Sequence, residues 1–336
     1  MTPGRYAGVL VALVLLCVYL SITQDVFLTW DNLMNIAKSN SVVFVLAIGA
    51  TFVVISAGID LSTASATAAA GMILGLTLEA GWSIVPVLAA TVLFGILLGL
   101  VNGIVITKLR ISFLVVTLGT LSIYQSFALV VNEGQTISVF GRPGFSILSD
   151  FVNDDIGPFP ILLVFDLVLL LVAGGVLRYT AYGRALFAVG SNREAARLNG
   201  IAVGRIILIT YGIGGLAAGL ASLVQVGRLA GASAQADPSL LLTVVAAVLI
   251  GGTAYTGGEG GVLGTLVGVL FLGVVQNGLT LSDVSSFWHG TISGVILIAA
   301  VGVRLAHPSQ SRGHGEAVRD SRSRDDPGGA RRLWRR

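Results

Sequence analysis

The sequence predicts an all-α integral membrane protein with about ten transmembrane helices, some of them short or broken. Three observations predict this class: the composition, the separation of apolar segments by polar breaks, and the clustering of charge. Hydrophobic residues make up 54% of the 336 residues and charged residues only 11%. A soluble domain carries about 25% charged residues. So much apolar surface is stable in a bilayer, where helices satisfy their own backbone hydrogen bonds.

The predicted spans are apolar segments between polar or charged breaks. They cover residues 7–22, 41–57, 63–78, 83–105, 111–131, 159–177, 206–227, 242–256, 261–279 and 287–304. The first has the charge-then-apolar order of a signal peptide but no clear small-x-small cleavage site, so we interpret it as a membrane helix. Segments 63–78 and 242–256 are short and rich in small residues, which predicts broken, re-entrant or tightly packed helices.

Charge placement predicts the orientation. With a cytoplasmic N-terminus, residues 108–110, residues 178–205 and the tail fall on the cytoplasmic side, and these segments hold most of the Lys and Arg. The loop 132–158, with four acids and one arginine, falls outside. The positive-inside rule therefore places both termini in the cytoplasm. We expect a transmembrane domain over residues 1–306 and a disordered basic tail over 307–336.

The chain has no pattern typical of a catalytic or cofactor site. It lacks a glycine-rich phosphate loop that ends in Gly-Lys-Ser/Thr. The single cysteine, Cys17, excludes a disulfide or cysteine metal site within one chain, and His289, His307 and His314 lack ligand spacing. We therefore expect no catalytic residue, no metal and no cofactor. The basic tail is interpreted as a topology signal rather than a nucleic-acid site.

Polar residues inside the apolar segments are either structural or functional. Asp60, in "SAGIDLSTASA", is a helix cap or a substrate contact, and capping is the favoured interpretation. Asn102 hydrogen-bonds between helices or simply packs there. Asp166 is the most deeply placed acid and must face the bundle interior or water. Gln225, near Arg228, either faces incoming substrate or marks the outer interface.

One polar stretch, "YGRALFAVGSNREAARLNGIAVGR" (182–205), interrupts the apolar chain. Within it, Ser191 and Glu194 form the pattern of a capping box, and Gly200 stands where a helix C-terminus favours a residue with positive φ. The pattern predicts a helix of about two turns, which is marginal alone and must pack against something.

The side chains of this predicted helix suggest two docking surfaces. Arg193 and Arg197 lie one turn apart and share a face, while Ala195, Leu198 and Ile201 approach another face. The helix lies either on its own membrane domain or against a soluble partner, and the strong end signals favour docking into a groove.

The same stretch resembles the cytoplasmic coupling segment of ABC-importer permeases of the ribose/xylose/galactose type. That family has the pattern GxNxxAAxxxGI, which reads here Gly190, Asn192, Ala195, Ala196, Gly200 and Ile201. Three further blocks are similar to the family's in order and spacing: "GIDLS" (58–62), "FLVVTLGTLSIY" (113–124), and "AAVLIGGTAYTGGEGGVLGTLVGVLFLGVVQNGL" (246–279) followed by "SSFWHGTISGVILIAAV" (285–301). The resemblance covers about residues 40–304.

The chain departs from the family pattern at several positions. They are Ala57 for glycine, Ser112 for proline, Gln125–Ser126 for Arg-Gly, Leu241–Val244 for an acidic "ELDA" block, and Glu259 for a basic residue. The pattern of the coupling element itself is intact.

The resemblance implies a type II ABC-importer-like permease that carries a monosaccharide across the bacterial inner membrane. It further implies ATP hydrolysis by separate ATPase subunits on the cytoplasmic side, a substrate-binding protein outside, and a second permease copy, most simply in a homodimer. The implied ATPase-coupling residues are Gly190, Ser191, Asn192, Glu194, Ala195, Ala196, Arg197, Gly200 and Ile201. The implied translocation path includes Gly58, Asp60, Ser62, Asn102, Thr117, Gly119 and Gln225.

Two alternatives stay open at this point. Under the first, the protein is the same kind of permease but its cargo is a branched-chain amino acid or a nucleoside, because permeases for those cargoes share the fold and some of the blocks. A stand-alone channel or secondary transporter is the second, which an inverted repeat with discontinuous helices would favour.

Overall fold

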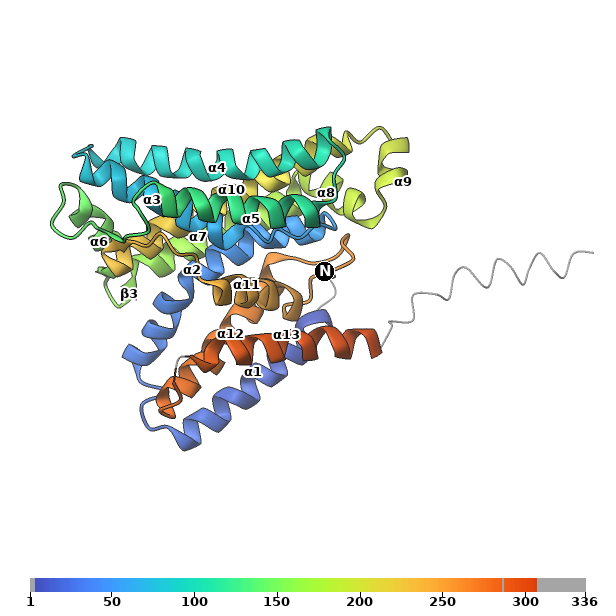
Figure 1. The fold of residues 1–336 in the computed structure, drawn as a ribbon. Coiled ribbons are helices and arrows are strands. Elements are labelled where there is room, and N and C mark those ends of the chain that lie inside the picture. The colour runs from blue at the N-terminus through green and yellow to red at the C-terminus, as the bar shows by residue number, and fades with distance from the viewer. Residues whose placement is uncertain (1–3, 286, 307–336) are drawn as a thin grey trace, which may run out of the picture. The chain divides into compact units, whose positions relative to one another are not determined.

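The computed structural model describes residues 4–285 and 287–306 (Figure 1). The chain divides into two units, Met1–Ala300 and Val301–Arg336, and only the end of one helix is described in the second unit. The predicted disordered tail, with His307 and His314, lies outside the described residues.

The described part of the chain is mainly helical, and each predicted apolar segment coincides with a helix. These helices are α1 (Gly4–Thr23), α2 (Trp30–Ile55), α3 (Thr63–Glu79), α4 (Ile84–Lys108), α5 (Phe113–Val130), α7 (Ile161–Tyr179), α10 (Val203–Leu229), α11 (Pro238–Ile250), α12 (Val262–Leu281) and α13 (Trp288–Ala306). Three further helices are α6 (Phe145–Asn153), α8 (Ala181–Ser191) and α9 (Arg193–Leu198).

Two helices, α2 and α11, depart most from the predicted segments. The helix predicted to begin at residue 41 begins at Trp30, because Thr29 caps it and accepts a hydrogen bond from the Asn32 N–H at 3.4 Å. The segment predicted at 242–256 is helical at Pro238–Ile250, because Asp237 accepts from the Ser239 N–H at 2.8 Å and glycines follow residue 250. In both cases a polar cap, not the start of the apolar run, sets the first residue.

The loop between α5 and α7 is partly structured. It holds α6 and three two-residue strands, β1 (Ile137–Ser138), β2 (Asp155–Ile156) and β3 (Phe159–Pro160). Strand β1 pairs antiparallel with β4 (Gly231–Ala232), which follows α10, and β2 pairs antiparallel with β3.

Among the described residues, six helices are long and apolar enough to cross a membrane: α2, α4, α5, α7, α10 and α12. The apolar parts of α1, α11 and α13 are shorter, and α3 has 17 residues rich in Ala, Ser and Thr. A mostly helical membrane protein is therefore confirmed, while the number of spans stays a prediction.

Helix α10 is the centre of the larger unit. It packs against α4, α2 and α3, and α3 packs in turn against α4 and α5, so these helices run side by side in Figure 1. Helix α12 packs against α1, α2 and α11. Most of α2 is buried, whereas α4, α5 and α7 each expose an apolar face, as expected for helices that border lipid or a partner.

Facing glycines bring α4 and α10 into backbone contact. Gly95 and Gly99 on α4 meet Gly215 and Gly219 on α10, and a Cβ added at Gly95 would lie 2.6 Å from the Gly215 carbonyl oxygen. A Cβ at Gly99 would collide with the carbonyl oxygen of Tyr211. Small residues at i and i+4 allow this close approach. In lipid no hydrophobic driving force holds helices together, so van der Waals packing between the close backbones stabilises the pair instead.

Replacing Gly99 with leucine is expected to lower the thermal midpoint of the purified protein in detergent. The added side chain meets backbone atoms, which cannot rotate away, so we expect a loss of about 1–3 kcal/mol or more. The matched control is Gly119→Ala on α5, where nothing lies within 4 Å of an added Cβ. Tryptophan fluorescence on heating measures both variants, and equal midpoints would contradict the proposed contact.

Candidate functional site

The polar stretch folds into two short helices, α8 and α9, joined at Asn192. The Asn192 Oδ1 accepts hydrogen bonds from the N–H groups of Glu194 and Ala195, both at 3.0 Å. Ser191 instead ends α8, where its Oγ donates to the Phe187 carbonyl at 2.9 Å. The predicted Ser191 cap is therefore wrong by one residue, because α8 continues through Ser191 and asparagine caps as well as serine does.

The C-terminus of α9 agrees with the sequence prediction. Gly200 has φ +79°, and its N–H bonds to the Arg197 carbonyl at 3.0 Å. The Ile201 N–H returns to the Ala196 carbonyl at 3.0 Å. These two bonds satisfy carbonyls that a helix end leaves unpaired, so α9 is closed at both ends.

The surface of α9 divides differently from the prediction. Ala196 is the buried residue of the helix, whereas Ala195 is exposed and Leu198 is 77% exposed. Ala195 and Leu198 therefore do not pack against the membrane domain and stay free for a partner. Because the segment is tied down by its flanks, an apolar side chain is left pointing outward.

The two arginines of α9 make unrelated contacts, so the expectation of one shared arginine face is wrong. Arg197 Nη2 lies 2.7 Å from Glu194 Oε1, and both side chains are exposed. The hydrogen bond from Arg197 and its charge lower the pKa of Glu194. Arg193 turns toward the membrane domain, and its Nη2 donates to the carbonyls of Ser56 and Ala57, both at 3.3 Å.

Helix α8 is anchored to the membrane domain by a tyrosine. The Tyr182 ring stacks on Phe52 of α2 with ring centroids 6.4 Å apart, and its hydroxyl bonds to Thr210 Oγ1 of α10 at 2.8 Å. Burial raises the pKa of Tyr182 to about 12. At the other end of α8, Gly190 is buried against the Ile55 carbonyl with no room for a Cβ.

The "GIDLS" block is a break between α2 and α3 that is held by a buried polar network. Asp60 Oδ1 accepts from the Ser62 N–H at 2.9 Å and from its Oγ at 2.6 Å. Asn102 Nδ2 of α4 donates to the same Ser62 Oγ at 2.9 Å. Tyr124 of α5 donates to the Leu98 carbonyl at 2.8 Å and contacts Asn102 Oδ1 at 3.3 Å. These bonds tie the start of α3 to α4 and α5.

The remaining predicted path residues lie outside this network. A Cβ at Gly58 would lie 3.0 Å from the Tyr211 hydroxyl, so Gly58 borders the break. Thr117 is fully buried on α5 and its Oγ1 has no hydrogen-bond partner among the residues that the structure describes, whereas Gly119 is on the exposed side of the same helix. Gln225 is half-buried near the end of α10.

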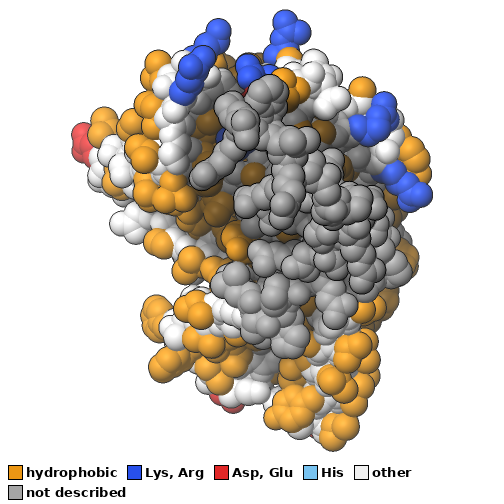
Figure 2. Space-filling view, turned by 90° about the vertical axis from the view of Figure 1, so that its right-hand side faces the viewer, with side chains coloured by type: hydrophobic (Ala, Val, Ile, Leu, Met, Phe, Trp, Pro, Cys, Tyr) orange, Lys and Arg blue, Asp and Glu red, His pale blue; other side chains and the backbone are white. Residues whose placement is uncertain are grey.

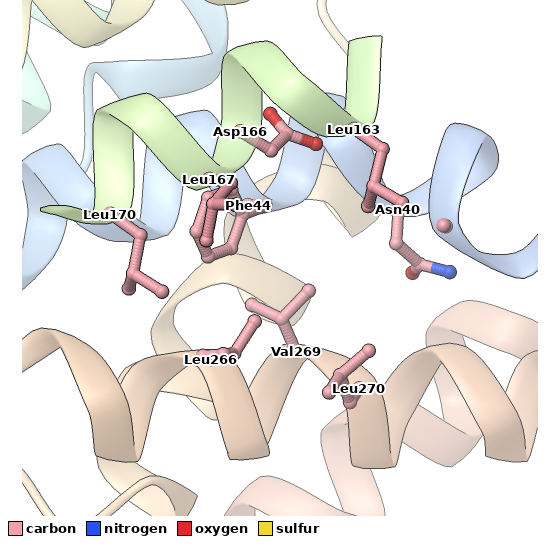
Figure 3. Close-up of a pocket in the computed structure, with 10 residues that line it drawn as sticks. Asn40, Phe44, Leu163, Asp166, Leu167, Leu170, Leu266, Val269 and Leu270 are labelled. Atoms are coloured by element: carbon pink, nitrogen blue, oxygen red, sulfur yellow. The ribbon is translucent and has the colours of Figure 1, made fainter. Parts of the chain in front are cut away.

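The deepest acid has a partner that the sequence did not indicate. Ser41 of α2 donates its hydroxyl to Asp166 Oδ1 of α7 at 2.9 Å. Asp166 borders an apolar cavity of about 300 Å³ between α2, α7 and α12, which leucines mainly line (Figure 3). Its lining is apolar apart from Asn40 and Asp166, so it offers few hydrogen-bonding groups to a polar cargo.

Comparison with known proteins decides the family. The family model described as "Branched-chain amino acid transport system / permease component" matches residues 32–301. The chain belongs to this family. It is therefore the permease component of an ABC importer and a multi-pass protein of the bacterial inner membrane, and ATP hydrolysis belongs to a separate subunit.

Three relatives are similar to this permease over most of their length. The ribose import permease protein RbsC of Haemophilus influenzae is 33% identical over 87% of this chain and 90% of its own. The D-allose transport system permease protein AlsC of Escherichia coli is 30% identical over 88% and 90%. The autoinducer 2 import system permease protein LsrC of Salmonella typhi is 32% identical over 89% and 85%. No solved structure matches the permease.

Across the described ranges of the permease, no group of three or more His, Cys, Asp or Glu side chains is arranged to hold a metal ion. Two residues that the sequence did not single out, Tyr124 and Gly258, complete the arrangement, together with the bonds of Arg193 to the Ser56 and Ala57 carbonyls. The glycine-rich pattern "GGEGG" (257–261) could have indicated a close backbone contact at Gly258. No pattern in the sequence indicated which residues the Arg193 side chain contacts.

Replacing Asn192 with alanine is expected to loosen the first turn of α9. The change removes the acceptor of two N–H groups, which costs about 0.5–2 kcal/mol locally. Hydrogen–deuterium exchange at the amides of Glu194 and Ala195 measures it. In the control Ser191→Ala these amides keep their acceptor, the Asn192 side chain. If both variants accelerated the exchange of these amides equally, the assignment of Asn192 as the sole cap would be wrong.

Proposed function

We propose that this permease imports a sugar of monosaccharide size. The single observation that carries the cargo class is its similarity over nearly the whole chain to permeases named for ribose and D-allose. The same family description names branched-chain amino acids, so the amino-acid alternative and the nucleoside alternative stay open to the same test.

The exposed part of α9 is proposed as the ATPase docking site. Glu194, Arg197 and Leu198 stand on a short helix that is closed at both ends, and Leu198 is an exposed apolar side chain suited to a groove. The flanking residues of the implied coupling set serve to hold this helix: Asn192 caps it, Gly200 ends it, and Gly190 packs its base.

The proposed orientation puts α9 and both termini in the cytoplasm, with ten membrane-crossing helices. Figure 2 looks onto the end where α9 lies in Figure 1, and Lys and Arg side chains gather around its rim with few acids. Exposed basic residues of the segments that lead to this end are Lys108, Arg110, Arg184, Arg193, Arg197 and Arg205. Basic residues favour the cytoplasmic side.

The proposed partners follow from this orientation. A substrate-binding protein would dock at the opposite end, where α6 and the short strands lie. A second copy of the permease would pack on an exposed apolar helix face, which makes the simplest assembly a homodimer with two ATPase subunits.

A different class of function, a stand-alone channel or secondary transporter, makes the opposite prediction. It requires transport without ATP and no docked partner on α9. Proteoliposomes that contain the permease alone therefore distinguish the two classes, because the importer transports only with its ATPase subunits, its binding protein and ATP.

Changing both Arg197→Glu and Leu198→Asp is expected to release the ATPase subunits. The changes reverse the charge and add a second acid on the proposed docking face without touching the caps of α9. Co-purification of the co-expressed complex measures ATPase association, and we expect about a tenfold loss, the typical weight of a central apolar or arginine contact. The control Arg184→Glu makes the same charge reversal on α8. Unchanged association in the double variant would overturn the docking role.

The cargo class is tested on the substrate-binding protein of the same system. Its thermal midpoint is expected to rise with one or more monosaccharides, because a ligand that binds only the folded state stabilises it by mass action. Branched-chain amino acids and nucleosides are measured in parallel. A rise with one of those classes and none with sugars would replace the cargo assignment and leave the importer role standing.

A further inference from the structure

Three segments that are distant in sequence meet at the end of α2. The Gly258 N–H, from the loop between α11 and α12, donates to the Ile55 carbonyl at 2.9 Å. Gly190, at the end of α8, packs against the same carbonyl, and a Cβ there would lie 2.5 Å from the Gly258 nitrogen. The contact of Ile55 with Gly190 and Gly258 is therefore made of backbone atoms, which yield less than flexible side chains when one segment is displaced relative to another.

Arg193 completes this junction from α9. Its guanidinium donates to the Ser56 and Ala57 carbonyls at 3.3 Å. The last carbonyls of a helix have no partner within the helix and carry partial negative charge, so a cation there is favourable. Ala57 has φ +58°, a conformation that costs a non-glycine residue about 1–2 kcal/mol, and the arginine holds the chain in that bend.

The bend leads within three residues to the buried polar network. Asp60 follows Ala57 closely and bonds Ser62, which connects to Asn102 and through it to Tyr124. The Ile59 carbonyl, inside the same break, accepts from Tyr211 of α10 at 3.4 Å. A displacement of the Ser56–Ala57 carbonyls would therefore reach α3, α4, α5 and α10 through contacts already made.

We propose that Arg193 is the positioning residue through which movement of α9 reaches the break between α2 and α3. The inference rests on the proposed docking of ATPase subunits on α9. In this route the movement enters the membrane domain at the end of α2, and not through the chain connections of the α8–α9 segment to α7 and α10. Arg197, on the outward side, receives the ATPase contact, and Arg193 passes the displacement inward. Coupling then needs only that the Arg193 bonds differ between two states of the permease.

The test compares Arg193→Gln with Arg184→Gln in the assembled importer. Arg184 lies on α8 and is exposed, so its substitution removes the same charge from the same end of the molecule. Proteoliposomes with the permease, its ATPase subunits, the loaded binding protein and MgATP report the cargo transported per ATP hydrolysed. Co-purification reports ATPase association separately.

We expect Arg193→Gln to keep the ATPase bound and its basal hydrolysis intact while transport per ATP falls about tenfold, the typical weight of hydrogen bonds made by a charged group. Arg193→Lys is expected to restore part of the ratio, because an ammonium group also donates to carbonyls but without the planar fork. The Arg184→Gln control is expected to match the unmodified permease.

Two results would overturn the proposal. The first is an unchanged transport ratio in Arg193→Gln. The second is loss of ATPase association in that variant, which would assign Arg193 to the docking face. The thermal midpoint in detergent shows whether Arg193→Gln is folded as well as the control, so that a lower transport ratio at an equal midpoint reports lost coupling. If the midpoint of Arg193→Gln falls, Arg193→Lys takes its place in the comparison. Failure of the docking role itself is distinguishable, because it is measured by the Arg197 and Leu198 double variant.

Discussion

The carbonyls at the end of α2 impose the constraint on which the rest of the arrangement depends. The last carbonyls of a helix have no partner within that helix, so their hydrogen-bond donors must come from elsewhere. Here Ile55, Ser56 and Ala57 obtain their donors from Gly258 and Arg193. The need to satisfy these groups draws the α11–α12 loop and the α8–α9 segment to one point, and that point lies beside the polar network of Asp60.

Close packing of glycines makes this convergence possible. The contact of α4 with α10 places Asn102 against Ser62, because Asn102 lies one turn beyond Gly99 on the same helix. Gly190 and Gly258 let a second set of backbones touch at Ile55. Since backbone contacts are stiff, a small movement at one of them displaces its partner rather than being absorbed by side-chain rotation. The arrangement suits a protein whose role is to transmit motion between a surface helix and its membrane helices.

Much of the fold follows from local properties of the sequence, and the deviations have local causes. The apolar segments predicted where the helices lie, because a helix in a membrane must be apolar. Hydropathy did not predict where α2 and α11 begin, because the polar caps Thr29 and Asp237 set those first residues. At α9 the cap is Asn192 and not the predicted Ser191, because α8 extends through Ser191. A partner for Asp60 and an interhelical bond from Asn102 were foreseeable, because a lone polar side chain in an apolar segment needs a partner. The predicted helix cap at Asp60 is not formed, since the N-cap residue of α3 is Ser62, to which Asp60 bonds.

By itself the sequence determined a helical membrane protein, its basic and acidic ends, and the position of a short capped helix, because these depend on composition and on neighbours within one or two turns. Only the tertiary structure decided that Arg193 bonds the end of α2 while Arg197 pairs with Glu194, that Ser41 pairs with Asp166, and that three distant segments share the end of α2. Those outcomes depend on which unsatisfied groups come within hydrogen-bond reach when helices pack, and no local pattern in the chain encodes that.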